Sequence, residues 1–132
     1  MDVEWVREYC LSLPHTTERL QWEDNLVLKV GGRMYAIVAL EPGEYWLSFK
    51  CSDEAFAEML EVPGVVPAPY LARAKWVSVE TETALRREEI KQWLRQAYEL
   101  IFARLPRKTQ SALRRVLKKP LNKRKKRMGR KR

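Results

Sequence analysis

Basic and acidic side chains are unevenly divided along this chain, and the division limits which residues can form a folded core. The 132 residues include 26 Lys or Arg and 17 Asp or Glu, yet the last 29 residues hold fifteen of the basic side chains and no acidic one. The first 103 residues therefore carry a net charge of about −6 and the remainder about +15. We expect the first part to fold and the second to attract polyanions, chiefly nucleic acid and then anionic membrane.

The composition of the first part is that of one soluble domain. The chain is 45% hydrophobic, and about 100 residues suffice for one core. Cys10 and Cys51 are the only cysteines, too few for a disulfide framework, so we expect two buried thiols in a reducing compartment. No apolar run reaches the ~20 residues of a membrane helix, and the N-terminus lacks the features of a signal peptide. These observations predict a soluble, cytoplasmic protein.

The spacing of apolar residues predicts the secondary-structure elements. Helical spacing predicts helices over residues 3–13 and 87–105, with a short helix near residues 53–60. Alternation predicts strands over residues 26–30, 33–40, 45–50 and 75–80, and Gly31-Gly32 suits a tight hairpin turn between the first two. Residues 15–24 are predicted to be a polar connection. Residues 65–71 contain two prolines, which argues against an interior strand.

The predicted fold class is α+β, because a run of strands is bracketed by helices. We expect two layers, an antiparallel β-meander with N- and C-terminal helices packed on one face, in the order α-β-β-β-α-β-α. This domain spans residues 1–105, and a basic C-terminal extension follows it. Residues 106–120 are predicted to form a basic amphipathic helix, with Thr109 as its N-cap and Pro120 as its stop. Residues 121–132 are predicted to be a disordered basic tail.

Several short motifs resemble those of a known family. They are Leu13-Pro14 with Glu18, Leu28-Lys29-Val30-Gly31-Gly32-Arg33-Met34-Tyr35-Ala36, Ser48-Phe49-Lys50-Cys51, Pro67-Ala68-Pro69-Tyr70-Leu71, Trp76-Val77-Ser78-Val79 and Tyr98. In order and spacing they are similar to the MmcQ/YjbR family of small bacterial proteins, and the similarity covers roughly residues 3–108. The resemblance implies a fold like that of bacterial frataxin (CyaY-like) and a DNA-binding role. Arg33 replaces the family's usual Lys but keeps a cation, whereas Ala97 replaces a Ser and removes its hydroxyl.

The chain offers little for catalysis. Its single histidine, His15, lies in a predicted loop, and a nucleophilic Cys10 or Cys51 would need a base beside it. Gly31-Gly32 forms a hairpin rather than a phosphate-binding loop. A frataxin-like fold raises the question of iron, but the acidic residues of the first helix are typical of a solvated face. We therefore expect no enzymatic activity, cofactor, metal site or small-molecule substrate.

Three surfaces are candidates for nucleic-acid binding. The first is the basic extension, with Arg114, Arg115, Lys118, Lys119, Lys123, Arg124, Lys125, Lys126, Arg127, Arg130, Lys131 and Arg132 as candidate phosphate contacts. The second consists of Lys29, Arg33 and Lys50, which neighbouring strands could set side by side; scattered solvated charge is the alternative. The third consists of Trp46 and Trp76, which could stack on bases if their face of the sheet is uncovered; burial under a helix is the alternative.

The predicted function is non-enzymatic binding of nucleic acid, DNA rather than RNA, mainly through the phosphate backbone. The alternative is a protein-interaction module whose cationic arm binds an acidic partner. Membrane binding should be weak, because the apolar face of the helix in the extension is small. No recognition helix, RNA-binding motif or zinc finger is present, so the sequence predicts no base-specific readout.

Overall fold

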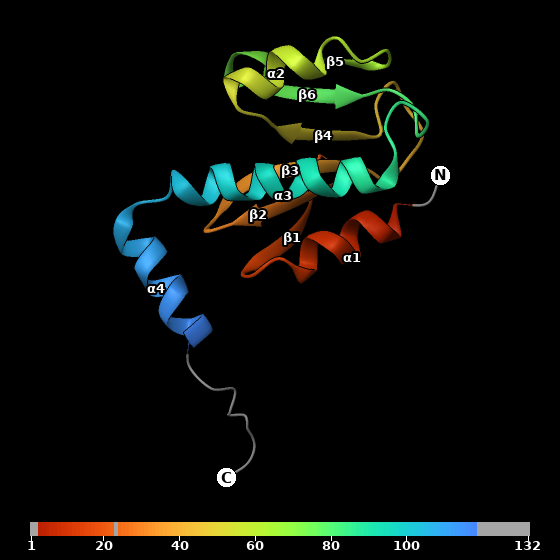
Figure 1. Cartoon of the computed structure of the whole chain (residues 1–132). Coiled ribbons are helices and arrows are strands. Elements are labelled where there is room, and N and C mark those ends of the chain that lie inside the picture. Colours follow the sequence, from red (N-terminus) through yellow and green to blue (C-terminus); the bar gives the residue numbers. More distant parts are fainter. Residues whose placement is uncertain (1–2, 23, 119–132) are drawn as a thin grey trace.

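The computed structural model describes residues 3–22 and 24–118, which form four α-helices, six β-strands and one short 3-10 turn (Figure 1). In chain order these are α1 (Glu4–Ser12), β1 (Thr16–Gln21), β2 (Asn25–Val30), β3 (Arg33–Ala39), β4 (Leu47–Lys50), α2 (Asp53–Met59), β5 (Val65–Pro67), η1 (Ala72–Ala74), β6 (Trp76–Val79), α3 (Arg87–Ala103) and α4 (Arg107–Lys118). The predicted disordered tail, residues 121–132, lies outside the described residues, as does Pro120.

One antiparallel sheet joins the strands in the order β1-β2-β3-β4-β6-β5. The first four strands form a meander, after which β6 pairs with β4 and leaves β5 at the edge. Helices α1, α2 and α3 pack on one face, where helix residues such as Cys10, Met59 and Leu94 form one core with strand residues such as Leu28 and Phe49 (Figure 1). The predicted fold class, an α+β meander with helices on one face, is confirmed.

The prediction that residues 15–24 form a polar connection is wrong, because Thr16–Gln21 is strand β1, paired with β2 along its whole length. This strand lies at the edge of the sheet and is mostly exposed, with Leu20 59% accessible to solvent. An exposed edge strand has no buried face to impose alternating apolar residues, so its sequence resembles a loop. A second short strand, β5, lies at the opposite edge, where the proline at its end is tolerated.

A β-bulge in β3 turns two successive side chains towards the helices. Lys29 pairs with Met34 while Leu28 pairs with Ala36, so Tyr35 is the extra residue. The buried Tyr35 hydroxyl lies 2.9 Å from Thr16 Oγ1, and its ring packs edge-on against Tyr98. These contacts hold β1 against the core despite its exposed surface.

Helix α4 leaves the body at the end of α3 (Figure 1). It begins at Arg107, directly after Pro106, so Thr109 lies inside its first turn and is not the predicted N-cap. The Gln110 side chain donates to the carbonyls of Ala103 and Leu105 at 3.2 and 2.8 Å. These bonds satisfy backbone acceptors at the C-terminal end of α3 and so fix the corner between the two helices.

Candidate nucleic-acid interface

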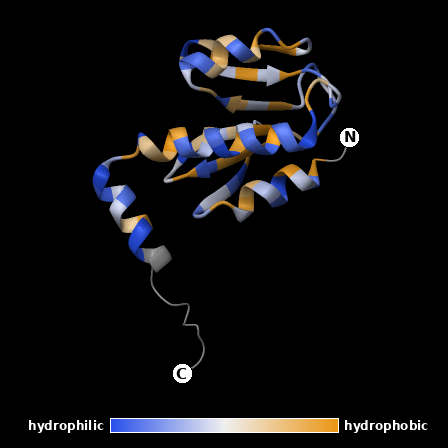
Figure 2. Ribbon diagram, viewed as in Figure 1, coloured by the Kyte–Doolittle hydropathy of each residue, from blue (hydrophilic) through white to orange (hydrophobic). Residues whose placement is uncertain are grey.

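The described part of the basic extension presents cations without carboxylate partners. Arg107, Lys108, Arg114 and Arg115 are exposed on α4, and none of them is in an ion pair with another described residue. Figure 2 shows α4 as mainly hydrophilic. The Arg114 guanidinium lies 5.3 Å from the centre of the Phe102 ring, which orients it without neutralising it. The helix therefore offers a surface of uncompensated positive charge.

Of the remaining predicted phosphate contacts of the extension, only Lys118 lies among the described residues. Lys118 is the last residue of α4, in agreement with the helix predicted there. The other predicted contacts lie outside the described residues: Lys119, Lys123, Arg124, Lys125, Lys126, Arg127, Arg130, Lys131 and Arg132.

The predicted cluster of Lys29, Arg33 and Lys50 does not form. Arg33 pairs with Val30, a fully buried core residue, so its Cβ is directed to the helix-covered face of the sheet. Lys29 is the neighbour of Val30 in the same strand and therefore lies on the opposite face, across from Met34. The hairpin brings the two backbones together but sends the two side chains apart.

Lys50 lies on the same face of the sheet as Lys29 but is only 3% exposed, so it is not part of a cationic surface. Its ammonium group donates to the carbonyl oxygen of Ala74, at the end of η1. Burial, reinforced by the charge of Arg104, lowers the pKa of Lys50 from its ordinary value. The side chain acts as an internal hydrogen-bond donor that ties β4 to η1.

Trp46 and Trp76 are each 3% exposed, so neither can stack on a base in this structure. Trp76 lies on the face that the helices leave open, whereas Trp46 belongs to the core cluster that also contains helix residues such as Ile90. The loop between β5 and η1 is bonded to both backbone groups of Trp76, through Ala68 N–H at 3.0 Å and Leu71 C=O at 3.2 Å. The loop thus occupies the space beside this tryptophan.

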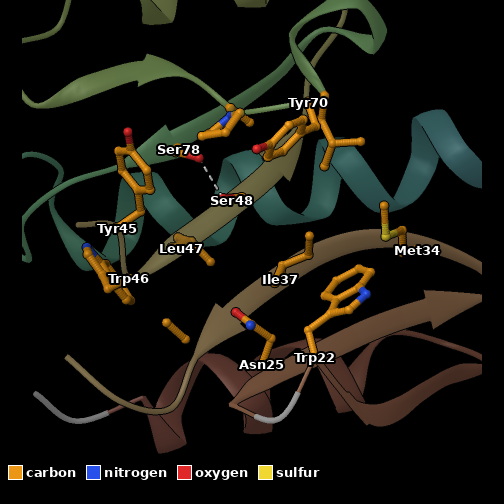
Figure 3. Close-up of a pocket in the computed structure, with 14 residues that line it drawn as sticks. Trp22, Asn25, Met34, Ile37, Tyr45, Trp46, Leu47, Ser48, Tyr70 and Ser78 are labelled. Carbon is orange, nitrogen blue, oxygen red and sulfur yellow. Dashed lines mark hydrogen bonds between the residues drawn. The ribbon is translucent and has the colours of Figure 1, made fainter. Parts of the chain in front are cut away.

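The helix-free face of the sheet contains a cleft of about 580 Å³ that the sequence analysis did not predict (Figure 3). It is lined by Trp22, Asn25, Met34, Ile37, Ala39, Tyr45, Trp46, Leu47, Ser48, Ala68, Pro69, Tyr70, Leu71 and Ser78. No charged side chain lines it. At its floor the hydroxyls of Ser48 and Ser78 lie 2.7 Å apart and are hydrogen-bonded.

Two exposed aromatic side chains border this cleft. Trp22 is 59% exposed and Tyr70 is fully exposed. Trp22 follows β1 in the chain and Tyr70 precedes η1. The two side chains lie on opposite sides of the cleft, with Ile37 and Ser48 between them (Figure 3). Trp22 falls in the segment predicted to be a polar connection and Tyr70 in the proline-containing segment predicted not to be an interior strand. The signal that could have found them is a large aromatic residue in a polar or proline-rich segment.

Among the described residues, no helix is long and apolar enough to cross a membrane. Within the same residues, no three His, Cys, Asp or Glu side chains gather to form a metal site.

The fold and surface place the chain in a class of small α+β proteins with one helix-covered sheet face and one open face. Comparison with protein families then gives the particular family: a model of the YjbR family matches residues 11–100, and the chain belongs to that family. The resemblance expected from the short motifs is thus confirmed. The basic extension lies outside the matched residues.

Solved structures share the fold. A Deinococcus radiodurans protein, described with the family domain DUF419, is 28% identical with a TM-score of 0.75, covering 84% of this chain and 86% of its own. A protein from Pseudomonas syringae is 19% identical with a TM-score of 0.63, covering 76% of this chain and 98% of its own, a likeness of fold alone. No curated protein matches the chain significantly.

Proposed function

We propose that this protein binds nucleic acid, DNA in preference to RNA, through contacts of its basic extension with the phosphate backbone. The observation that carries the proposal is the set of exposed α4 cations that have no carboxylate partner among the described residues. In a chain whose last 29 residues contain no acid, phosphate is the natural counterion, and release of the ions bound to it drives association. The function is binding and includes no catalytic step.

The placement of α4 supports this reading. The helix is held to the body by Gln110 and Arg114. It extends away from the body, where its cations can contact successive phosphates of a nucleic-acid strand (Figure 1). The free, buried thiols of Cys10 and Cys51 suit a reducing compartment, which supports our proposal that the protein is cytoplasmic.

The test is the salt dependence of binding to a labelled duplex, measured by fluorescence anisotropy with the full chain. The wild-type slope of log K against log salt should be about −0.9 for each phosphate contacted. Replacing Arg107, Lys108 and Arg115 with Gln should make the slope shallower by about one to three. The matched control is Arg95→Gln, which removes an exposed α3 cation already paired with Glu99 at 3.4 Å.

Two results would overturn the proposal. One is no binding to DNA or RNA at low salt. The other is a triple variant whose slope equals that of Arg95→Gln. Binding to an acidic protein but to neither nucleic acid would instead establish the adaptor function.

A further inference from the structure

The cleft on the open face lies beside two cations of the same face. Arg19 is opposite Val27, which is opposite Ile37 in the cleft lining. Lys29 is opposite Met34, a second lining residue. Directly opposite residues share a face of a sheet, so Lys29 lies next to a lining residue of the cleft, and Arg19 lies on the same face, two strands away from Ile37. Neither is in an ion pair with any described residue.

The two aromatic residues at the rim are held in an unusual backbone conformation. Trp22 has a φ of 49° and Tyr70 a φ of 66°. A bulky side chain rarely adopts positive φ, and the conformation is unfavourable unless the surroundings enforce it. Of the described non-glycine residues only four have positive φ, and the two that are exposed aromatics both border this cleft. The backbone is strained at the positions that present flat rings to solvent.

The lining indicates the chemistry of the occupant. An uncharged, largely apolar wall favours a neutral ligand over a phosphate or carboxylate group. Exposed aromatic faces favour flat rings, and the hydroxyls of Ser48 and Ser78 with the amide of Asn25 can meet hydrogen-bonding ring edges. The volume is within the usual range of organic-ligand clefts, roughly 300–1,000 Å³. Lys29, beside Met34, and Arg19, one strand farther out on the same face, add anion-binding groups outside the neutral wall.

We propose that this cleft binds unpaired bases of a single-stranded nucleic acid, stacked on Trp22 and Tyr70, while Arg19 and Lys29 contact the adjoining phosphates. A neutral ring within the cleft and an anion at its border is the charge pattern of a nucleotide strand. A base within a duplex is stacked and paired and cannot enter. The inference rests on the proposed function and extends it, because it gives the body a site of its own that prefers single strands.

The experiment compares three labelled probes of equal length at one salt concentration: a single strand, its duplex, and a strand of the same backbone without bases. The full chain should bind the single strand at least tenfold more tightly than the baseless strand, since stacking on protein aromatics stabilises each base substantially. Trp22→Gly with Tyr70→Gly should remove about tenfold of affinity for the single strand only. Glycine suits the positive φ at both positions, so this variant should stay folded.

Three further variants separate the roles. Trp22→Phe keeps a flat ring and should retain most of the affinity. Leu20→Ala is the matched control, because Leu20 is also 59% exposed but lies opposite Leu26, on the other face of the sheet. Arg19→Gln with Lys29→Gln should make the salt slope for the single strand shallower by about 1.4, whereas the aromatic variants should leave the slope unchanged.

The outcomes distinguish this inference from the proposed function. Equal wild-type affinity for the single and baseless strands would overturn the cleft site while leaving phosphate binding by the extension in place. The aromatic variant could abolish the preference for the single strand while the α4 substitutions have no effect. This result would support the cleft site and overturn binding through the extension. No binding to any probe would overturn both.

Discussion

Gly31 offers a sharp test of how the β2–β3 hairpin is packed. Gly31 and Gly32 form the turn with φ of 59° and 82°. A Cβ at Gly31 would lie 2.6 and 2.9 Å from the two methyl carbons of Leu105, whereas a Cβ at Gly32 would meet nothing within 4 Å. Alanine at either position must adopt positive φ, but only Gly31→Ala also collides with the core.

The two costs can be assigned separately. Placing alanine in the left-handed region costs about 1–2 kcal/mol, and this should be the whole effect of Gly32→Ala. Overpacking a buried site costs about 1–3 kcal/mol more, and Leu105 is only 4% exposed. We therefore expect Gly31→Ala to lower the free energy of unfolding by about 2–5 kcal/mol.

Urea unfolding of the full chain, followed by circular dichroism, measures these differences. A double-mutant cycle with Leu105→Ala identifies their origin, because shortening Leu105 makes room for the new methyl group. In that background Gly31→Ala should cost no more than Gly32→Ala does in the wild type. If Gly31→Ala and Gly32→Ala are equally destabilising, or if the cost of Gly31→Ala persists without the Leu105 side chain, the packing argument is wrong.

Two predictions concern pH. Burial raises the pKa of Cys10 and Cys51 from 9.0 to about 12, so the unfolded chain loses its thiol protons first, and the free energy of unfolding should fall as pH rises above about 9. Urea titrations should show a shallower fall in Cys10→Ala/Cys51→Ala; an equal fall would contradict this. Arg7 donates to Glu18 at 2.6 and 2.7 Å and lowers the pKa of Glu18 from its ordinary value of 4.5. The pair therefore stabilises the fold at neutral pH, and this stabilisation is lost as the pH falls through the lowered pKa of Glu18. Glu18→Gln should lower Tm by no more than about 4 °C at pH 7 and by nothing near pH 2, and a Tm difference that survives at the lower pH would refute the assignment.

The core could be predicted from sequence because burial imposes periodicity. Helix α3 presents Ile90, Leu94, Ala97 and Ile101 to the sheet at helical spacing, and all four are buried. The hairpin was signalled by two successive glycines. Strand β1 left no such signal, since its stability comes from pairing with β2 and not from a buried apolar face.

The candidate site was harder to predict, because it depends on which face each side chain takes. Lys29 and Arg33 lie on opposite faces, and a one-residue difference in register would have brought them together. The positive charge of the extension could be predicted from its composition alone, and Arg114 and Arg115 are exposed in the structure. The cleft could not be predicted, since Trp22 and Tyr70 are far apart in sequence and only the strand order brings them to opposite sides of one cleft.

The β5 edge of the sheet is protected against self-association by strand addition. Ala68 N–H donates to Trp76 C=O, so by alternation the backbone groups of Val65 and Pro67 are directed away from β6, towards the open edge. The Val65 N–H is already bonded to the Val62 carbonyl at 3.1 Å, and Pro67 has no N–H to donate. Neither position can donate to a strand from another copy. Amyloid-like stacking through this edge is therefore disfavoured, even at high protein concentration.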